Sequence, residues 1–311
     1  MSFKRITVVV ITYNQETVIG RALESILKQK EWGLHCIVIC DDKSTDNNWD
    51  VIQKYKEDYP SFIDSHRNET NKGIYGNLQL ALSYIQDTDL IIMCSGDDAL
   101  CDGYFKRVQE YIEENNIDIS MPISIFSDWK SMSPTGKEDF FSNKNICSKL
   151  GPFSAKLRGL VYNRSVFNTL KVIKRFTPLP LEKGLAISEG VFDLMTELYT
   201  EKIYYMPYVG SIYFSGIGIS TKLNNAKYLL EEAQKWKYYI AVFDLSKKDK
   251  AFCEYNYYFC KFMVHPSFIN YYNTLKFYCL SIPYLDRKSI YEFLFLFACL
   301  TKRIVIRKCA S

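Results

Sequence analysis

The chain has 311 residues, of which 48% are hydrophobic and 24% charged, the proportions of a globular protein that buries a core. Its formal net charge of +4 is too small to indicate a nucleic-acid partner, and we expect none. No stretch reaches the roughly 18 apolar residues that a membrane-spanning helix requires. Only three histidines occur, at scattered positions, which argues against a zinc site or a serine triad.

The first half of the sequence alternates between apolar β-branched runs and amphipathic stretches. This alternation predicts parallel strands joined by right-handed crossovers, hence a doubly wound, mostly parallel α/β sheet with helices on both faces. We expect strands at 6–12, 35–40, 62–66, 90–94 and 117–126, and helices at 17–30, 46–58, 74–85 and 102–115.

The second half has a less regular pattern. Residues 130–149 have a loop-like composition, 153–170 and 185–200 have helical spacing, and 204–214 predicts an aromatic strand. Beyond residue 221 the pattern is helical and rich in aromatic residues. We therefore expect a domain at 1–221, with halves 1–126 and 127–221, and a helical, aromatic-rich C-terminal extension at 222–311.

The charge is unevenly distributed along the chain. Residues 225–311 contain 14 Lys and Arg against 7 Asp and Glu, whereas residues 1–224 contain 25 against 28. A basic, aromatic segment at 289–311 suits docking on an anionic membrane surface. It equally suits packing against the domain or a second subunit, as in a homodimer, and the sequence leaves these readings open.

Ten cysteines occur, but no CxxC pair, and the apolar run near the N-terminus is typical of a strand and not of a signal peptide. We therefore expect buried thiols in a reducing compartment. This indicates a cytoplasmic protein, or one that is peripheral at the inner face of the membrane.

Polar clusters follow three of the predicted strands. They are Thr12-Tyr13-Asn14, Asp41-Asp42 and Asp97-Asp98. Ligands of doubly wound sheets bind beyond the carboxyl ends of the strands, so three polar clusters at one edge indicate a binding site. Taken singly, each cluster would suit an exposed turn that caps the next helix.

Four segments carry a resemblance to a known family: VVVITYNQETVIGRALESILKQ, CIVICDDKSTDNN, NKGIYGNLQLAL and LIIMCSGDDAL. In this order they resemble the motifs of family-2 glycosyltransferases, inverting enzymes with a glycosyltransferase A-type fold. The resemblance implies transfer of a sugar from a nucleoside-diphosphate sugar to a glycan or polyprenyl-linked acceptor. Members of this type build bacterial surface polysaccharides.

The resemblance also implies a metal site. Asp98 would bind Mn²⁺ or Mg²⁺, and Asp97 would lie near the metal, the ribose and the pyrophosphate. A divalent cation held by carboxylates neutralises the charge that grows on a diphosphate leaving group. Ser95 stands where the family has a further aspartate, which would weaken metal binding.

For the nucleotide, the resemblance implies that Tyr13 stacks on the base and Asp41 hydrogen-bonds to it. An acceptor beside an aromatic face suits uracil, whose N3–H donates, and therefore favours a UDP-sugar. Core packing is the alternative role for Tyr13. The expected nucleotide-sugar set comprises Thr12, Tyr13, Asn14, Asp41, Asp42, Ser44, Asn71, Gly73 and Asp97.

An inverting transfer needs a general base that takes the proton from the acceptor hydroxyl. By resemblance, Glu189 in AISEGVFDLMTEL is the candidate base, with Asp193 as the alternative and Gly190 in place of a second acid. Glu189 would otherwise belong to a helix cap that follows Ser188.

The sequence argues against two other classes of enzyme and leaves one class without catalytic activity open. A nucleotide-sugar pyrophosphorylase or a dinucleotide dehydrogenase needs a glycine-rich loop after the first strand, but no glycine occurs before Gly20. A catalytically inactive, glycosyltransferase-like binding or scaffold protein stays open, because Ser95 and Gly190 depart from the family pattern.

Overall fold

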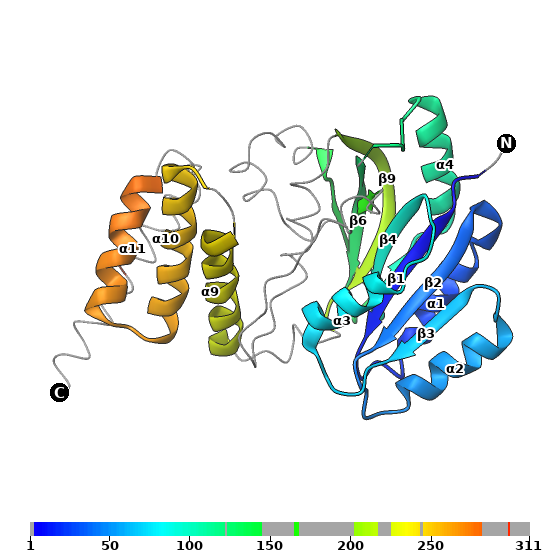
Figure 1. Cartoon of the computed structure of the whole chain (residues 1–311), viewed down its shortest axis with the longest axis horizontal. Coiled ribbons are helices and arrows are strands. Elements are labelled where there is room, and N and C mark those ends of the chain that lie inside the picture. Colours follow the sequence, from blue (N-terminus) through cyan, green and yellow to red (C-terminus); the bar gives the residue numbers. More distant parts are fainter. Residues whose placement is uncertain are drawn as a thin grey trace. The chain divides into compact units, whose positions relative to one another are not determined.

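The computed structural model of the protein describes residues 3–121, 123–144, 165–167, 202–216, 225–242, 245–281 and 298 (Figure 1). The chain forms two compact units, residues 1–222 and 223–311. The boundary expected from the sequence falls after residue 221.

The N-terminal unit begins with four parallel strands in the order β3-β2-β1-β4. A helix follows each strand before the next one begins, except that the short strand β5 separates β4 from α4. The strands are β1 (Ile6–Thr12), β2 (Leu34–Asp41), β3 (Ile63–Arg67) and β4 (Leu90–Ser95), and the helices are α1 (Ile19–Leu27), α2 (Asn48–Asp58), α3 (Gly73–Ser83) and α4 (Tyr104–Glu114). A 3₁₀ turn, η1 (Lys30–Trp32), precedes β2.

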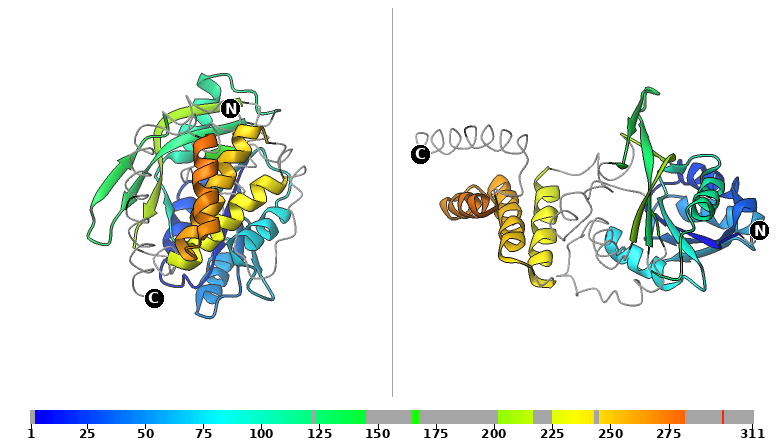
Figure 2. Two further views of the ribbon diagram at one scale, coloured as in Figure 1. Left: turned by 90° about the vertical axis from the view of Figure 1, so that its left-hand side faces the viewer. Right: turned by 90° about the horizontal axis from the view of Figure 1, so that it is seen from above.

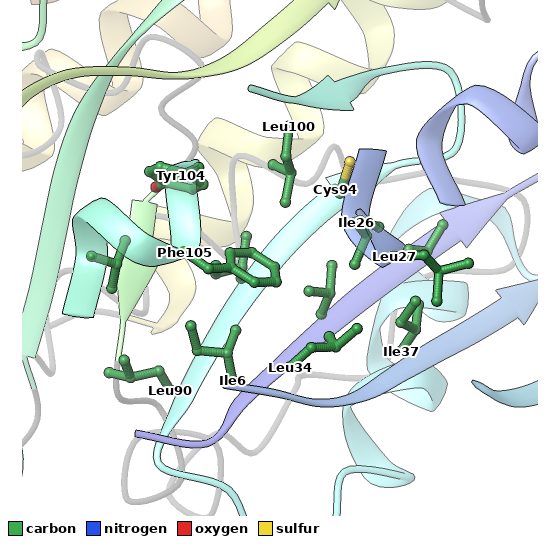
Figure 3. Close-up of a cluster of buried hydrophobic side chains, with 14 of the residues drawn as sticks. Ile6, Ile26, Leu27, Leu34, Ile37, Leu90, Cys94, Leu100, Tyr104 and Phe105 are labelled. Carbon is green, nitrogen blue, oxygen red and sulfur yellow. The ribbon is translucent and has the colours of Figure 1, made fainter. Parts of the chain in front are cut away.

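Helices cover both faces of this sheet because side chains alternate between the faces along each strand. Val8 and Val10 of β1 lie in a buried cluster with residues of α1, α2 and α4. Val9, between them, packs with Leu78 and Ala81 of α3. Figure 3 shows the larger cluster, in which Phe105 of α4 lies with apolar side chains of the strands. The doubly wound α/β architecture is therefore confirmed.

The sheet continues beyond β4 in the order β4-β8-β6-β9-β5, and β7 pairs with β6. Strands β6 and β9 are parallel, whereas β8 is antiparallel to both β4 and β6. These strands are β5 (Ala99–Leu100), β6 (Ile123–Met132), β7 (Glu138–Phe141), β8 (Ser165–Phe167) and β9 (Lys202–Phe214). The sheet is thus parallel in its first four strands and mixed in the remainder.

Some element boundaries differ from those expected. The strand predicted at 117–126 begins at Ile123 and runs to Met132, and residues 138–141 form β7 inside the predicted loop. Strands β6 and β7 form a hairpin of polar composition. Pairing of β6 with β7 and β9 stabilises it, since strand formation depends on neighbouring strands. Strand β5 was not expected. Residues 165–167 form β8 inside the predicted helix at 153–170; the rest of that range lies outside the described residues, as does the helix predicted at 185–200.

The C-terminal unit contains the expected aromatic helices, α9 (Asn225–Val242), α10 (Lys247–Val264) and α11 (Phe268–Ser281), and α10 packs against both of the others (Figure 2). Aromatic pairs link them. The rings of Trp236 and Phe252 lie 5.6 Å apart at a steep angle, and those of Tyr258 and Phe277 are stacked at 5.6 Å. Within the described part of the chain, no helix combines the length and apolarity needed to cross a membrane.

The seven described cysteines are free thiols. Burial raises the pKa of Cys40 to about 12 and that of Cys36 to about 11, so both stay protonated near neutral pH. Protonated thiols are poor nucleophiles and poor metal ligands. Cys279 is exposed, which corrects the expectation that it would be buried.

Candidate active site

The carboxyl ends of β1, β2 and β4 meet at one edge of the sheet. Thr12, the last residue of β1, pairs with Asp41 of β2, and Ile11 pairs with Ser95 of β4. The three polar clusters therefore leave the sheet side by side. This arrangement is the one that the strand pattern predicted, and it forms the candidate site.

The turn after β2 is built around the carboxylate of Asp41, which is 0% exposed. Its Oδ1 accepts hydrogen bonds from the Ser44 hydroxyl and from Nδ2 of Asn48, the latter at 2.8 Å. Its Oδ2 accepts from the Ser44 amide at 3.1 Å and lies 3.3 Å from Nε of Arg67. Both oxygens are thus already engaged by protein donors, so this geometry makes Asp41 an anchor of the turn.

Asp42 holds the start of α3. Its Oδ1 accepts from the Lys72 amide at 2.7 Å, and its Oδ2 accepts from the Gly73 amide at 2.8 Å. A carboxylate at these amides satisfies donors that a helix N-terminus leaves unpaired and interacts favourably with the helix dipole. Asn71 adds a bond from its Nδ2 to the Asp42 carbonyl at 3.2 Å. The predicted residues Asp42, Asn71 and Gly73 therefore lie together.

The turn after β1 is tied to the turn after β2. The amide of Asn14 donates to the Ser44 hydroxyl at 2.9 Å, and Oδ1 of Asn14 accepts from the Thr45 amide at 2.8 Å. Asn14 has a positive φ of 52°, which Asn tolerates better than most residues. The buried Thr12 hydroxyl donates to Oε1 of Gln15 at 2.7 Å, and Tyr13 is half-buried. Tyr13 therefore retains surface that a ligand can contact.

The third turn carries the two adjacent carboxylates. It is tight, since the Asp98 amide donates to the Ser95 carbonyl at 3.1 Å. Asp98 is 2% exposed, and its Oδ1 accepts from the amide of Phe214, the last residue of β9, at 3.1 Å. Asp97 is half-buried. The pairing of β5 with β9 brings the end of β9 to this turn.

Gly96 makes the close approach of this turn to β1 possible. A Cβ at this position would lie 2.4 Å from Oε1 of Gln15, 2.8 Å from Cδ1 of Ile19 and 3.0 Å from Cβ of Thr12. We expect Gly96→Ala to lower the free energy of unfolding by about 1–3 kcal/mol, the usual cost of overpacking, in a chemical denaturation series. Gly20→Ala is the matched control, because its nearest neighbour is the side-chain hydroxyl of Tyr55 at 3.1 Å. Equal stability of both variants would contradict the tight fit.

The donor set at the third turn suits a hard divalent cation. Mg²⁺ and Mn²⁺ prefer oxygen ligands, and Mg²⁺ is commonly held by one or two carboxylates together with substrate phosphates. Asp97 and Asp98 supply two carboxylates, and a diphosphate would supply further oxygens. Among the described residues, no group of three or more His, Cys, Asp or Glu side chains could hold a metal by itself. In chemical type, two adjacent carboxylates therefore fit a metal that takes its further oxygen ligands from a bound phosphate.

The candidate bases Glu189 and Asp193 lie outside the described residues. Sequence reasoning missed Asn48 and Arg67, which hold Asp41, and Phe214, whose amide binds Asp98. Arg67 could have been found by the strand-end rule, since it is the last residue of β3. Phe214 could not, because its contact depends on the pairing of distant strands.

The comparisons with known proteins identify the family of this chain. The profile of "Glycosyl transferase family 2" matches residues 7–170, more than half of the chain, and the chain belongs to this family. A segment of 124 residues is 27% identical to the processive diacylglycerol beta-glycosyltransferase of Mycoplasma pneumoniae, covering 39% of this chain and 36% of that protein. A segment of 92 residues is 33% identical to the UDP-Glc:alpha-D-GlcNAc-diphosphoundecaprenol beta-1,3-glucosyltransferase WfaP of Escherichia coli, covering 30% and 35%. The chain thus matches about a third of the length of these relatives.

Solved structures share the fold at low sequence identity. S. aureus TarS 1–349 in complex with UDP-GlcNAc superposes with a TM-score of 0.58 at 16% identity, covering 92% of this chain and 82% of that one. The mannosyltransferase PcManGT from Pyrobaculum calidifontis, in complex with GDP-Man and Mn²⁺, superposes with a TM-score of 0.55 at 13% identity, covering 96% and 81%. The fold is therefore of the glycosyltransferase A type.

Proposed function

We propose that this protein transfers a sugar, with inversion and with the help of a divalent metal, from a nucleoside-diphosphate sugar to a glycan or lipid-linked acceptor. A UDP-sugar is the favoured donor. The observation that carries the proposal is the meeting of three polar turns, after β1, β2 and β4, at one edge of the sheet, with Asp97 and Asp98 adjacent in the third. Family membership and the UDP-sugars in the names of two similar proteins support it.

The first two turns would bind the nucleoside. Tyr13 would provide an aromatic surface for the base, with Thr12 and Asn14 beside it. The Ser44 hydroxyl holds the turn after β1 against the turn after β2 by accepting a hydrogen bond from the Asn14 amide. We assign the buried Asp41 the role of anchor, so recognition of the base would come from side chains and amides around it.

The third turn would bind the diphosphate. Asp98 and Asp97 would hold Mn²⁺ or Mg²⁺, and the bound metal would neutralise charge on the leaving diphosphate. The Phe214 amide occupies Oδ1 of Asp98 and so fixes the orientation of that carboxylate. With Ser95 at the head of the turn, the phosphate oxygens would have to complete the coordination, so the metal and the nucleotide should bind cooperatively.

The proton of the acceptor hydroxyl would pass to Glu189, or to Asp193 if Glu189 serves as a helix cap. The acceptor class follows the names of the similar proteins, which include a diacylglycerol and a diphosphoundecaprenol substrate. With such acceptors, the proposed reaction would take place in the cytoplasm, at the inner face of the membrane. The basic segment 289–311 is proposed to contact either that anionic surface or a second subunit.

Release of the nucleoside diphosphate from donor sugars tests the activity without knowledge of the acceptor. We expect slow, Mn²⁺-dependent hydrolysis of one compound among UDP-glucose, UDP-N-acetylglucosamine and GDP-mannose, and its loss on addition of EDTA. Proton NMR of the first sugar formed should show the anomer opposite to that of the donor. Retained configuration would contradict inversion.

The alternative, an inactive binding or scaffold protein, is favoured only by Ser95 and Gly190. It predicts nucleotide binding without turnover. Absence of hydrolysis with every donor and with added lipid acceptors, alongside clear binding of UDP, would favour that reading over the enzyme.

A further inference from the structure

Three polar side chains form a line along one face of α1. Arg21, Ser25 and Gln29, which follows the end of the helix, are spaced four residues apart and so project from the same side. Ser25 and Gln29 are buried, although polar side chains are rarely placed inside a core without a partner. Their partners identify what this face does.

All three side chains bind the backbone that follows β4. Nη2 of Arg21 donates to the Asp97 carbonyl at 2.6 Å. Oγ of Ser25 accepts from the Leu100 amide at 3.0 Å, and Oε1 of Gln29 accepts from the Phe105 amide at 2.9 Å. The segment from Asp97, in the turn after β4, to the start of α4 is therefore fixed to α1 at three points.

Arg21 also contacts Phe214, the residue whose amide binds Asp98 in the turn after β4. The centre of its guanidinium lies 3.4 Å from the ring centroid of Phe214, and the amide of Phe214 donates to Oδ1 of Asp98. One cation thus holds the carbonyl of Asp97 and the residue that orients Asp98.

The environment of Arg21 argues against a role in stability alone. Its Nε is buried and has no hydrogen-bond partner among the described residues, and burial lowers the pKa of the guanidinium against the opposing influence of Asp97. An unpaired buried donor and a partly desolvated charge both cost stability. A methionine or leucine could fill this space without either cost.

We propose that Arg21 is a positioning residue of the metal–diphosphate site, which fixes Asp97 and Asp98 relative to each other through the Asp97 carbonyl and Phe214. Ser25 and Gln29 extend this support along the segment. The inference rests on the proposed function for its consequence, metal-dependent nucleotide binding, whereas the positioning itself is a property of the ligand-free protein.

The test compares Arg21→Met with the wild type in the full chain. Methionine keeps an apolar stem against Phe214 but removes the charge and the donor. Arg107→Met is the matched control, because Arg107 of α4 pairs with Glu110 and Glu114 at the surface. Hydrogen exchange of the Phe214 amide in the ligand-free protein is the first measurement, and Mn²⁺-dependent UDP affinity is the second.

In Arg21→Met, we expect the Phe214 amide hydrogen to exchange at least about 10-fold faster than in the wild type and Mn²⁺-dependent UDP binding to weaken by a similar factor. The exchange rates of the β1 and β2 amides should stay unchanged. Arg21→Lys should restore part of both, since it keeps the charge but not the planar stacking group. If Arg21→Met lowers the protection of all core amides, the test relies on Arg21→Lys, in which the exchange rate of the Phe214 amide and the Mn²⁺-dependent UDP affinity are measured in the same way.

Unchanged protection of the Phe214 amide in both variants would overturn the proposal. A wild type that binds no nucleotide would overturn the proposed function, while the exchange measurement would still decide whether Arg21 positions the turn. Faster exchange of the Phe214 amide together with unchanged Mn²⁺-dependent UDP binding would likewise overturn the claim that Arg21 supports the metal–diphosphate site.

Discussion

Replacing Asp98 with Asn is expected to lower Mn²⁺-dependent release of UDP from the preferred donor at least about 100-fold, since metal stabilisation of a leaving group is worth several kcal/mol. Asn has nearly the same size as Asp and can still accept from the Phe214 amide through Oδ1, so the contact at 3.1 Å can persist. The variant therefore removes the charge and leaves the turn in place. Initial rates at saturating donor and Mn²⁺ measure the effect.

Asp87→Asn is the control for this change. Asp87 is an exposed partner of Arg5 and precedes β4, at the opposite edge of the sheet from the site. The same chemical change there should leave the rate within about 2-fold, because exposed ion pairs contribute little. A rate for Asp98→Asn that matches that of Asp87→Asn would show that Asp98 holds no catalytic metal.

Replacing Asp41 with Ala is expected to lower the free energy of unfolding by about 1–3 kcal/mol, the cost of leaving a buried hydrogen-bond donor unsatisfied. The substitution would remove the acceptor of the buried Ser44 amide and the nearer acceptor of Nδ2 of Asn48, while the exposed Arg67 keeps its bond to the Ser44 carbonyl. Asp41→Asn should cost less, because one carbonyl oxygen remains. Guanidinium denaturation of the full chain measures both variants.

These variants also separate two roles for Asp41. As an anchor, Asp41 should affect UDP binding only in step with stability. Unchanged stability of Asp41→Asn together with loss of UDP binding would show that the carboxylate contacts the base directly, as the family resemblance implies.

The fold of the first four strands could largely be predicted because β1, β2 and β4 are mainly apolar runs, whereas β3, with the sequence IDSHR, gives a weaker strand signal. Strand β1 was predicted to the residue. Strand β5 could not be, since two residues form a strand only through pairing with β9, more than 100 positions further along. The second half of β6 was missed for the same reason, because its polar residues pair with β7 and β9.

The position of the candidate site could also be predicted, from polar residues that follow buried strands. The division of work among those residues could not. Asp41 and Asp42 are adjacent and alike in sequence, yet one anchors a turn and the other holds the start of α3. That difference depends on partners from other elements, such as Arg67 and the Gly73 amide. The contacts of Arg21 depend in the same way on the path of the chain after β4.

Calorimetric titration of UDP, GDP and dTDP into the full chain, each with Mn²⁺ and with EDTA, tests the central claim most directly. A metal–diphosphate site at the carboxyl edge of the sheet predicts that one nucleotide, with UDP favoured, binds at least about 10-fold more tightly with Mn²⁺ and that Asp98→Ala removes this difference. Binding that is equally tight in EDTA, or no binding of any of the three nucleotides, would contradict it.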